Sequence, residues 1–147
     1  MNQSLHDRDF LLWVEDTVAR LKKRDFDNLD LEHLIEEVEG LGIAQRHELS
    51  SRLLILLEHL LKRMFVPSPN DYRGWEVTIN NQRSSIDLLL EEVPSLKTLW
   101  PEIFEKAWTK ALKKVSREYK QIAFPDRWLY AADIESILNI DFWEEQS

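Results

Sequence analysis

The sequence predicts an all-α protein, and two observations lead to this fold class. The 147-residue chain contains only three glycines, whereas strands and hairpins depend on turn glycines and β-branched runs. Apolar residues also recur at every third or fourth position along most of the chain, which is the spacing of one helix face. With 44% hydrophobic residues to fill one core, we expect a single domain over residues 1–147. This domain would be a helical bundle of about five main helices, with a short C-terminal helix docked on it.

Two helices are expected in the N-terminal third. Residues 4–7 have the spacing of a capping box that begins with Ser4, and the apolar residues behind it predict a helix over residues 5–23. Asp30 is a good N-cap for a second, shorter helix. We expect this helix to end where Gly40 and Gly42 offer C-terminal stops.

The remaining helices follow from apolar periodicity and from proline. The central helix is expected over residues 44–66, until Pro67 and Pro69 break it. A fourth helix is expected over residues 74–92. A fifth begins near residue 95, is kinked or restarted at Pro101, and ends before Pro125. The aromatic and acidic remainder contains a short helical stretch over residues 133–138 and should dock on the bundle.

Composition excludes several classes of protein. The absence of cysteine excludes disulfides, thiolate metal sites, iron–sulfur clusters and a cysteine nucleophile. The net charge of −8 disfavours broad, sequence-independent binding to nucleic acid. Residues 1–16 are acidic and hold no long apolar run, so we expect neither a signal peptide nor a membrane span. A cytoplasmic location is the expectation.

The common catalytic signatures are absent. The chain has no Gly-rich nucleotide loop, no GxSxG elbow and no HExxH pair. A ferritin-like di-iron site would need Glu-x-x-His steps on two helices, but no Glu stands three residues before a His. The nearest approach is Asp30 with His33, where Asp30 is expected to be a cap. We therefore predict no cofactor and assign no metal ligands on these grounds, and we expect three histidines to be exposed without a role: His6, His33 and His47.

A set of polar residues borders the apolar face of the central helix. Arg52, His59 and Arg63 fall within about 40° of one another on a helical wheel. Glu37 and Glu39 flank the stripe of the preceding helix. These residues are the candidates for a pocket in which His59 acts as a base or ligand with one of the carboxylates, and the arginines hold an anion. The alternative, which we favour, is a structural ion-pair network between the two helices.

Two further groups carry alternatives of the same kind. In the fourth helix Trp75, Gln82 and Arg83 could grip a planar or anionic ligand, although such residues more often simply pack. Residues 43–129 are the basic part of the chain, with fourteen Lys and Arg against eleven acids. Within them, one face of the fifth helix could bind nucleic acid, although a solvated face is the more frequent role of such charge. Its residues are Lys106, Lys110, Lys113, Arg117 and Lys120.

Five blocks, in order along nearly the whole chain, resemble the domain-of-unknown-function family number 29. They are Asp9-Phe10 with Trp13, Leu29-Asp30 through Leu34-Ile35-Glu36-Glu37-Val38-Glu39 to Gly42, Arg52 through Leu56-Leu57 to His59-Leu60-Leu61-Lys62, Trp75 with Thr78-Ile79 and Gln82-Arg83, and Asp141-Phe142-Trp143. The resemblance implies a bacterial family, abundant in cyanobacteria, with an all-α fold and no established activity. Small departures at Ile43-Ala44 and Gly74 concern local capping.

Our leading functional hypothesis is a cytoplasmic helical binding protein without catalytic activity, which holds a protein partner or a second copy of itself. Six tryptophans in a chain without a catalytic signature favour it. The alternative is a metal-dependent enzyme acting on nucleic acid or another phosphate-bearing substrate. A second alternative is nucleic-acid binding through the basic helix over residues 106–120. A membrane role is not expected.

Overall fold

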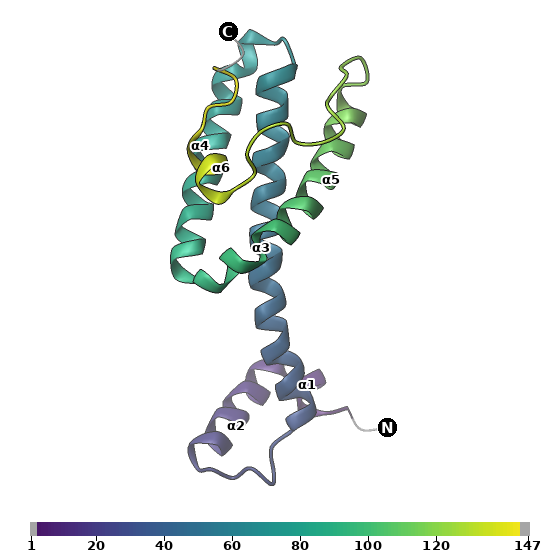
Figure 1. Ribbon diagram of the computed structural model, residues 1–147. Helices are drawn as coiled ribbons and strands as arrows, with labels where there is room; N and C mark the ends of the chain where they lie inside the picture. Colours follow the sequence, from purple (N-terminus) through teal and green to yellow (C-terminus); the bar gives the residue numbers. More distant parts are fainter. Residues whose placement is uncertain (1–2, 145–147) are drawn as a thin grey trace. The chain divides into compact units, whose positions relative to one another are not determined.

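The computed structural model describes residues 3–144 and confirms the all-α fold class (Figure 1). Within this part of the chain there is no strand, and none of its helices is both long and apolar enough to cross a membrane. Six α-helices and one 3-10 helix follow in order: α1 (Leu5–Arg8), α2 (Phe10–Lys22), α3 (Leu31–Phe65), α4 (Pro69–Glu92), η1 (Pro94–Leu99), α5 (Trp100–Glu118) and α6 (Ile134–Asn139).

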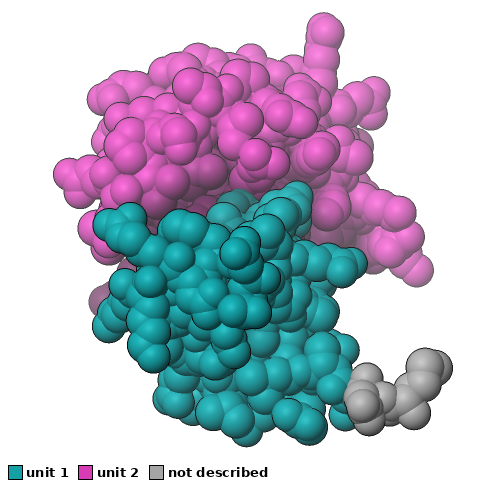
Figure 2. Space-filling model, turned by 90° about the horizontal axis from the view of Figure 1, so that it is seen from below, with its two compact units in different colours: residues 1–44 teal, residues 45–147 magenta. Residues whose placement is uncertain are grey.

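The chain divides into two compact units, which Figure 2 distinguishes by colour. Unit 1 comprises residues 1–44 and contains α1, α2 and the first part of α3. Unit 2 comprises residues 45–147 and contains the rest of α3 with α4, η1, α5 and α6. A single domain over residues 1–147 stays a prediction.

The predicted helix over residues 5–23 is interrupted at Asp9. Ser4 caps α1 as expected, because its hydroxyl accepts a hydrogen bond from the Asp7 N–H at 3.2 Å. Asp9 then adopts extended backbone angles, and its carboxylate accepts from the Leu12 N–H at 3.1 Å. A residue with its side chain engaged as an N-cap starts a new helix and so ends the previous one. The expectation of one uninterrupted helix was therefore wrong.

The expected break at Gly40 and Gly42 does not occur, and α3 takes the place of two predicted helices. Asp30 precedes α3 as predicted, and its carboxylate accepts from the His33 N–H at 3.3 Å. Glycine ends a helix when it adopts a left-handed conformation. No glycine in the described residues has a positive φ, so the helix continues through both positions to Phe65, ahead of the expected break at Pro67.

The core of unit 2 is built from three long helices and covered by the C-terminal segment. The part of α3 in this unit is apolar around most of its circumference, so α4 and α5 cover it on different sides (Figure 1). Pro69 is tolerated in the first turn of α4, which therefore begins five residues before the expected Gly74. Fully buried side chains of α3 include Leu49, Leu53, Leu56, Leu57, Leu60 and Leu61.

The C-terminal segment packs on unit 2 as predicted. Asp133 caps α6, because its carboxylate accepts from the Ser136 N–H at 3.1 Å. Hydrogen bonds with the Ser136 hydroxyl and with this N–H lower the pKa of Asp133. The Trp100 indole N–H donates to the Ala132 carbonyl at 2.7 Å, and Phe142 is 1% exposed. Aromatic anchors of this kind hold a terminal segment on a core.

Candidate functional site

The polar border of α3 is paired with α4 and with α3 itself. Arg63 donates from Nε to Glu76 Oε2 at 3.0 Å, and its guanidinium lies 3.8 Å from the centroid of the Tyr72 ring. Arg52 donates to Glu48 Oε1 at 3.2 Å and to Gln82 Oε1 at 3.5 Å. Both arginines therefore have partners in unit 2.

His59 and the two glutamates of the predicted pocket have separate surroundings. His59 is half-buried in unit 2 and donates from Nδ1 to the Ile55 carbonyl at 2.8 Å. In unit 1, Glu37 Oε1 accepts from His6 Nε2 at 2.6 Å, and Glu39 is exposed. Glu37 and His59 belong to different units, and one continuous helix, α3, replaces the two helices that we expected to contribute them.

Burial of His59 predicts a pH dependence of stability. Burial lowers the pKa of the imidazole below 6.5, so the folded chain resists the proton that the unfolded chain accepts. The His59 contribution to stability is therefore present above pH 6.5 and is lost as pH falls through the lower folded-state pKa. Urea denaturation across pH 4–8 should show that His59→Gln removes this part of the pH dependence, whereas His47→Gln, at an exposed position, does not.

Arg83 is a buried residue that holds the C-terminal segment. Its guanidinium donates to the Ile137 carbonyl at 3.0 Å, to Asp141 Oδ1 at 2.8 Å and to the Ile140 carbonyl. At 8% exposure, with protein acceptors on all three nitrogens, it is engaged in structure. Two of the blocks noted in the sequence, Gln82-Arg83 and Asp141-Phe142-Trp143, thus meet in space.

The other two members of the predicted ligand group on α4 do not converge with Arg83. Trp75 is half-buried, and its ring lies 6.0 Å from that of Tyr72. Gln82 is half-buried as well, and its amide oxygen accepts from Arg52. Trp75, Gln82 and Arg83 thus contact three different partners: Tyr72, Arg52 and the C-terminal segment. Ligand binding by them stays a prediction.

The basic residues predicted for the fifth helix are exposed. Lys106, Lys110, Lys113 and Arg117 lie on α5, whereas Lys120 lies beyond its end at Glu118. Lys106 is 4.0 Å from Glu102 at an exposed position, where such a pair contributes little. Nucleic-acid binding through this face stays a prediction.

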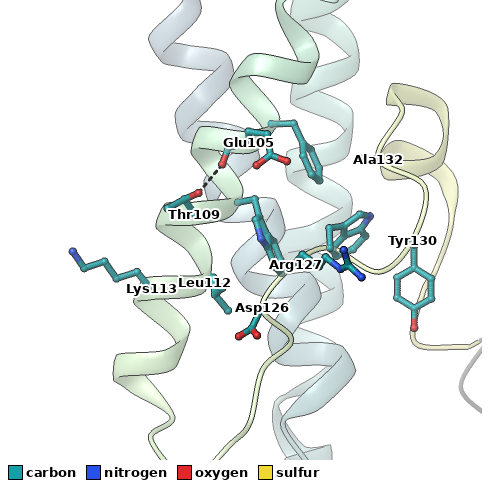
Figure 3. A pocket seen from close by; sticks show the side chains of 11 residues that line it. Glu105, Thr109, Leu112, Lys113, Asp126, Arg127, Tyr130 and Ala132 are labelled. Carbon is teal, nitrogen blue, oxygen red and sulfur yellow. Dashed lines mark hydrogen bonds between the residues drawn. The ribbon is translucent and has the colours of Figure 1, made fainter.

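An open groove lies between α5 and the segment that follows it in unit 2 (Figure 3). Its volume is about 510 Å³, and Lys113, Asp126 and Arg127 are among the charged residues that line it. Its aromatic walls are already engaged with one another, since the Trp128 ring lies 5.8 Å from Trp108 and 6.2 Å from Phe104. The Thr109 hydroxyl likewise donates to its own helix, at the Glu105 carbonyl (3.0 Å).

Unit 1 holds most of the exposed large hydrophobic side chains of the described chain. Eleven of the fourteen exposed large hydrophobic side chains of the described chain lie within residues 10–43, and only Trp13 and Thr17 are buried in this part. We define the apolar face of unit 1 as seven of these residues, each 40–69% exposed: Leu11, Val18, Leu21, Leu31, Ile35, Val38 and Leu41. Exposed apolar side chains that gather in one part of a protein are a common feature of interaction surfaces.

The expectation that His6 and His33 are surface residues was wrong. Their side chains are 13% and 22% exposed, and the two rings stack with centroids 4.1 Å apart. The periodicity of apolar residues could not predict this contact, because His6 and His33 are polar and lie 27 positions apart in the sequence. The signal in the sequence is the Asp30-x-x-His33 step, in which Asp30 is expected to be a cap.

Comparison with known proteins gives one result that bears on identity. No curated protein and no solved structure was found to match the chain. The model of the family described as Domain of unknown function DUF29 matches residues 5–143. The match covers nearly the whole chain, including α1 to α6 and the Arg83–Asp141 contact. The chain is therefore a member of the DUF29 family.

Proposed function

We propose that this protein is a cytoplasmic binding protein rather than an enzyme, and that it binds a second copy of itself through the apolar face of unit 1. The observation that carries the proposal is the concentration of exposed large hydrophobic side chains in residues 10–43. Water-exposed apolar surface is costly, and its burial against a partner is the dominant favourable term in association.

The spacing of the apolar residues favours a helical partner. On α2, Leu11, Val14, Val18 and Leu21 are three, four and three residues apart. The same three-four-three spacing recurs on α3 at Leu31, Leu34, Val38 and Leu41. This is the spacing of the seam between helices in coiled coils and four-helix bundles.

The two stripes lie on one side of the helix pair. Trp13 Nε1 donates to Asp30 at 3.3 Å, whereas His6, earlier in the chain, meets Glu37, later in the chain. The two segments therefore run antiparallel. Each stripe is offset by about 120° in the same sense from the packed side of its helix, which carries Trp13 on α2 and His33 on α3. In an antiparallel pair, equal offsets place both stripes on the same side, so the pair presents half of a four-helix bundle.

The area of the apolar face and the charge of unit 1 favour a second copy of the chain as the other half of the four-helix bundle. A half-exposed aliphatic side chain offers on the order of 100 Å², so the seven residues offer about 700 Å², close to the roughly 800 Å² that each partner contributes to a standard interface. Unit 1 also carries charge of both signs. The end of α2 is basic (Arg20, Lys22, Lys23), and the start of α3 is acidic (Glu32, Glu36, Glu37, Glu39). A second copy can set one against the other.

The test is the mass of the full chain in solution. Light scattering or sedimentation at tens of micromolar should give twice the chain mass of 17.5 kDa. Val38→Lys, at a position 58% exposed, should give a monomer with unchanged helical circular dichroism. The matched control is Val77→Lys on α4, which is 50% exposed outside the apolar face and should remain dimeric. A monomeric wild type, or a dimer that survives Val38→Lys, would exclude this interface.

A further inference from the structure

A histidine pair in unit 1 is held between carboxylates. His6 Nε2 donates to Glu37 Oε1 at 2.6 Å, while His6 Nδ1 lies 3.3 Å from Asp7 Oδ1. The hydrogen bond to Glu37 raises the pKa of His6 above 6.5, and the bond with His6 lowers the pKa of Asp7. Glu37 thus fixes the orientation of the ring and leaves Nδ1 directed at a second carboxylate.

His33 is oriented in the same way from the other side. His33 Nδ1 donates to Asp30 Oδ2 at 2.6 Å, and the same oxygen accepts from Trp13 Nε1 at 3.3 Å. The hydrogen bond with His33 lowers the pKa of Asp30. Trp13 is 4% exposed and meets the His6 ring edge-on at 4.8 Å. A buried indole therefore anchors both the carboxylate that holds His33 and the ring of His6.

Each imidazole is thus oriented by one carboxylate, Glu37 at His6 Nε2 and Asp30 at His33 Nδ1, while His6 Nδ1 already contacts Asp7. This is the arrangement in which a metal-ligating histidine is oriented by an outer carboxylate. One ligand atom each from His6, Asp7 and His33 lies within 4.8 Å of the others. The 3.3 Å between His6 Nδ1 and Asp7 Oδ1 is already the separation of two ligands that sit about 2.0–2.1 Å from a tetrahedral ion.

The composition of unit 1 is consistent with a bound cation. Only Trp13 and Thr17 are buried within its described residues, so its own core is small. Folded units of about 40 residues usually depend on disulfides, metals or oligomerisation, and this chain has no cysteine. Three carboxylates, those of Asp7, Asp30 and Glu37, also surround the two imidazoles in a segment with eleven acids against five bases.

We propose that His6, Asp7 and His33 form a binding site for a divalent transition-metal ion such as Zn²⁺, which links α1 to α3 within unit 1. Glu37 and Asp30 are the positioning residues that orient the two histidines. The ion takes the place of the proton at His6 Nδ1. Three protein ligands leave one position of a tetrahedral ion for water.

The donor set selects the class of metal. Two imidazole nitrogens and one carboxylate suit Zn²⁺, Ni²⁺, Co²⁺ and Cu²⁺. Mg²⁺ and Ca²⁺ prefer sites made wholly of oxygen. Closing the site from a spread of 4.8 Å requires the two imidazole rings, which are stacked with their planes 10° apart, to rotate until one nitrogen of each points at the ion.

The test is calorimetric titration of the full chain with Zn²⁺, together with thermal unfolding. We expect one Zn²⁺ per chain and a melting temperature that rises with Zn²⁺ but not with Mg²⁺. His33→Gln should weaken binding by more than about 100-fold, and Glu37→Gln, which leaves all three ligands in place, by the 10–100-fold typical of outer-shell partners. Bound Co²⁺ should show the absorption bands of a four-coordinate ion.

The matched control is His47→Gln, which removes an exposed histidine of the same helix and should bind Zn²⁺ as the wild type does. Far-UV circular dichroism of each metal-free variant separates loss of a ligand from loss of the fold. The Val38→Lys variant should also keep its Zn²⁺ affinity, so failure of self-association and failure of the metal site are distinguishable. No saturable Zn²⁺ binding, or wild-type affinity in His33→Gln, would refute the site.

Discussion

Replacing Arg83 with Met should lower the free energy of unfolding by about 3–5 kcal/mol. The substitution keeps a long side chain but removes three charge-assisted hydrogen bonds at a buried position. The carbonyls of Ile137 and Ile140 lose their donor, and the Asp141 carboxylate loses its counter-ion. Urea denaturation followed by circular dichroism measures the change. Limited proteolysis should show early cleavage after residue 119, since the segment beyond α5 loses its anchor.

The matched control is Arg73→Met, an exposed position on the same helix, for which we expect a change within about 0.5 kcal/mol. The change in the free energy of unfolding for Asp141→Asn should lie between those for Arg83→Met and Arg73→Met, because Arg83 keeps its hydrogen bonds to the Ile137 and Ile140 carbonyls. Wild-type stability in Arg83→Met would mean that the guanidinium contributes nothing to the packing of the C-terminal segment, and its assignment to structure would then fail.

Replacing Glu58 should raise the free energy of unfolding, whereas replacing Arg83 lowers it. Glu58 is 3% exposed, and Lys114 Nζ lies 3.2 Å from its Oε1, at ion-pair distance but outside hydrogen-bond geometry. A buried carboxylate with one partner recovers little of its desolvation cost, so a well-packed apolar side chain of similar volume is often more stable. We expect Glu58→Met to raise the free energy of unfolding by about 1–4 kcal/mol.

Replacing Lys114, the ion-pair partner of Glu58, provides the comparison for the stability of Glu58→Met. Lys114→Met leaves the buried carboxylate without its cation and should lower stability. The loss should be about 1 kcal/mol, because the Lys114 side chain is 62% exposed and water screens the pair. In the Glu58→Met background the same Lys114 substitution should have no effect. A loss of stability in Glu58→Met would show instead that the carboxylate is required for α3–α5 packing.

The fold could be predicted wherever local chemistry decides it. The caps at Ser4 and Asp30 are each set by a side chain and a backbone N–H three residues ahead, which the sequence displays directly. The expected stop at Gly40 and Gly42 failed because a glycine only permits the left-handed conformation. Whether a helix stops there depends on neighbours that the sequence does not place.

In the candidate site, too, the sequence identified individual residues but not the partners that the fold brings to them. Periodicity identified Arg52, Arg63, Gln82 and Arg83 as polar residues at the edge of apolar stripes, and all four have polar partners. It did not identify the partners: Arg63 pairs with Glu76 of α4, whereas we expected a glutamate of the preceding helix, Glu37 or Glu39. The pairing of His6 with His33 needs α1 folded back on α3, an arrangement that no local pattern encodes.

The anchoring of the C-terminal segment also sets an order of events during synthesis. The acceptors of Arg83 lie 54, 57 and 58 residues later in the chain. A ribosome therefore releases α3 and α4 well before the backbone carbonyls and the carboxylate that receive the guanidinium. The two helices can pair early through local contacts, but Arg83 stays hydrated until residues 137–141 emerge. Completion of this core is thus a late step, and the half-made chain exposes a leucine-rich surface that chaperones would recognise.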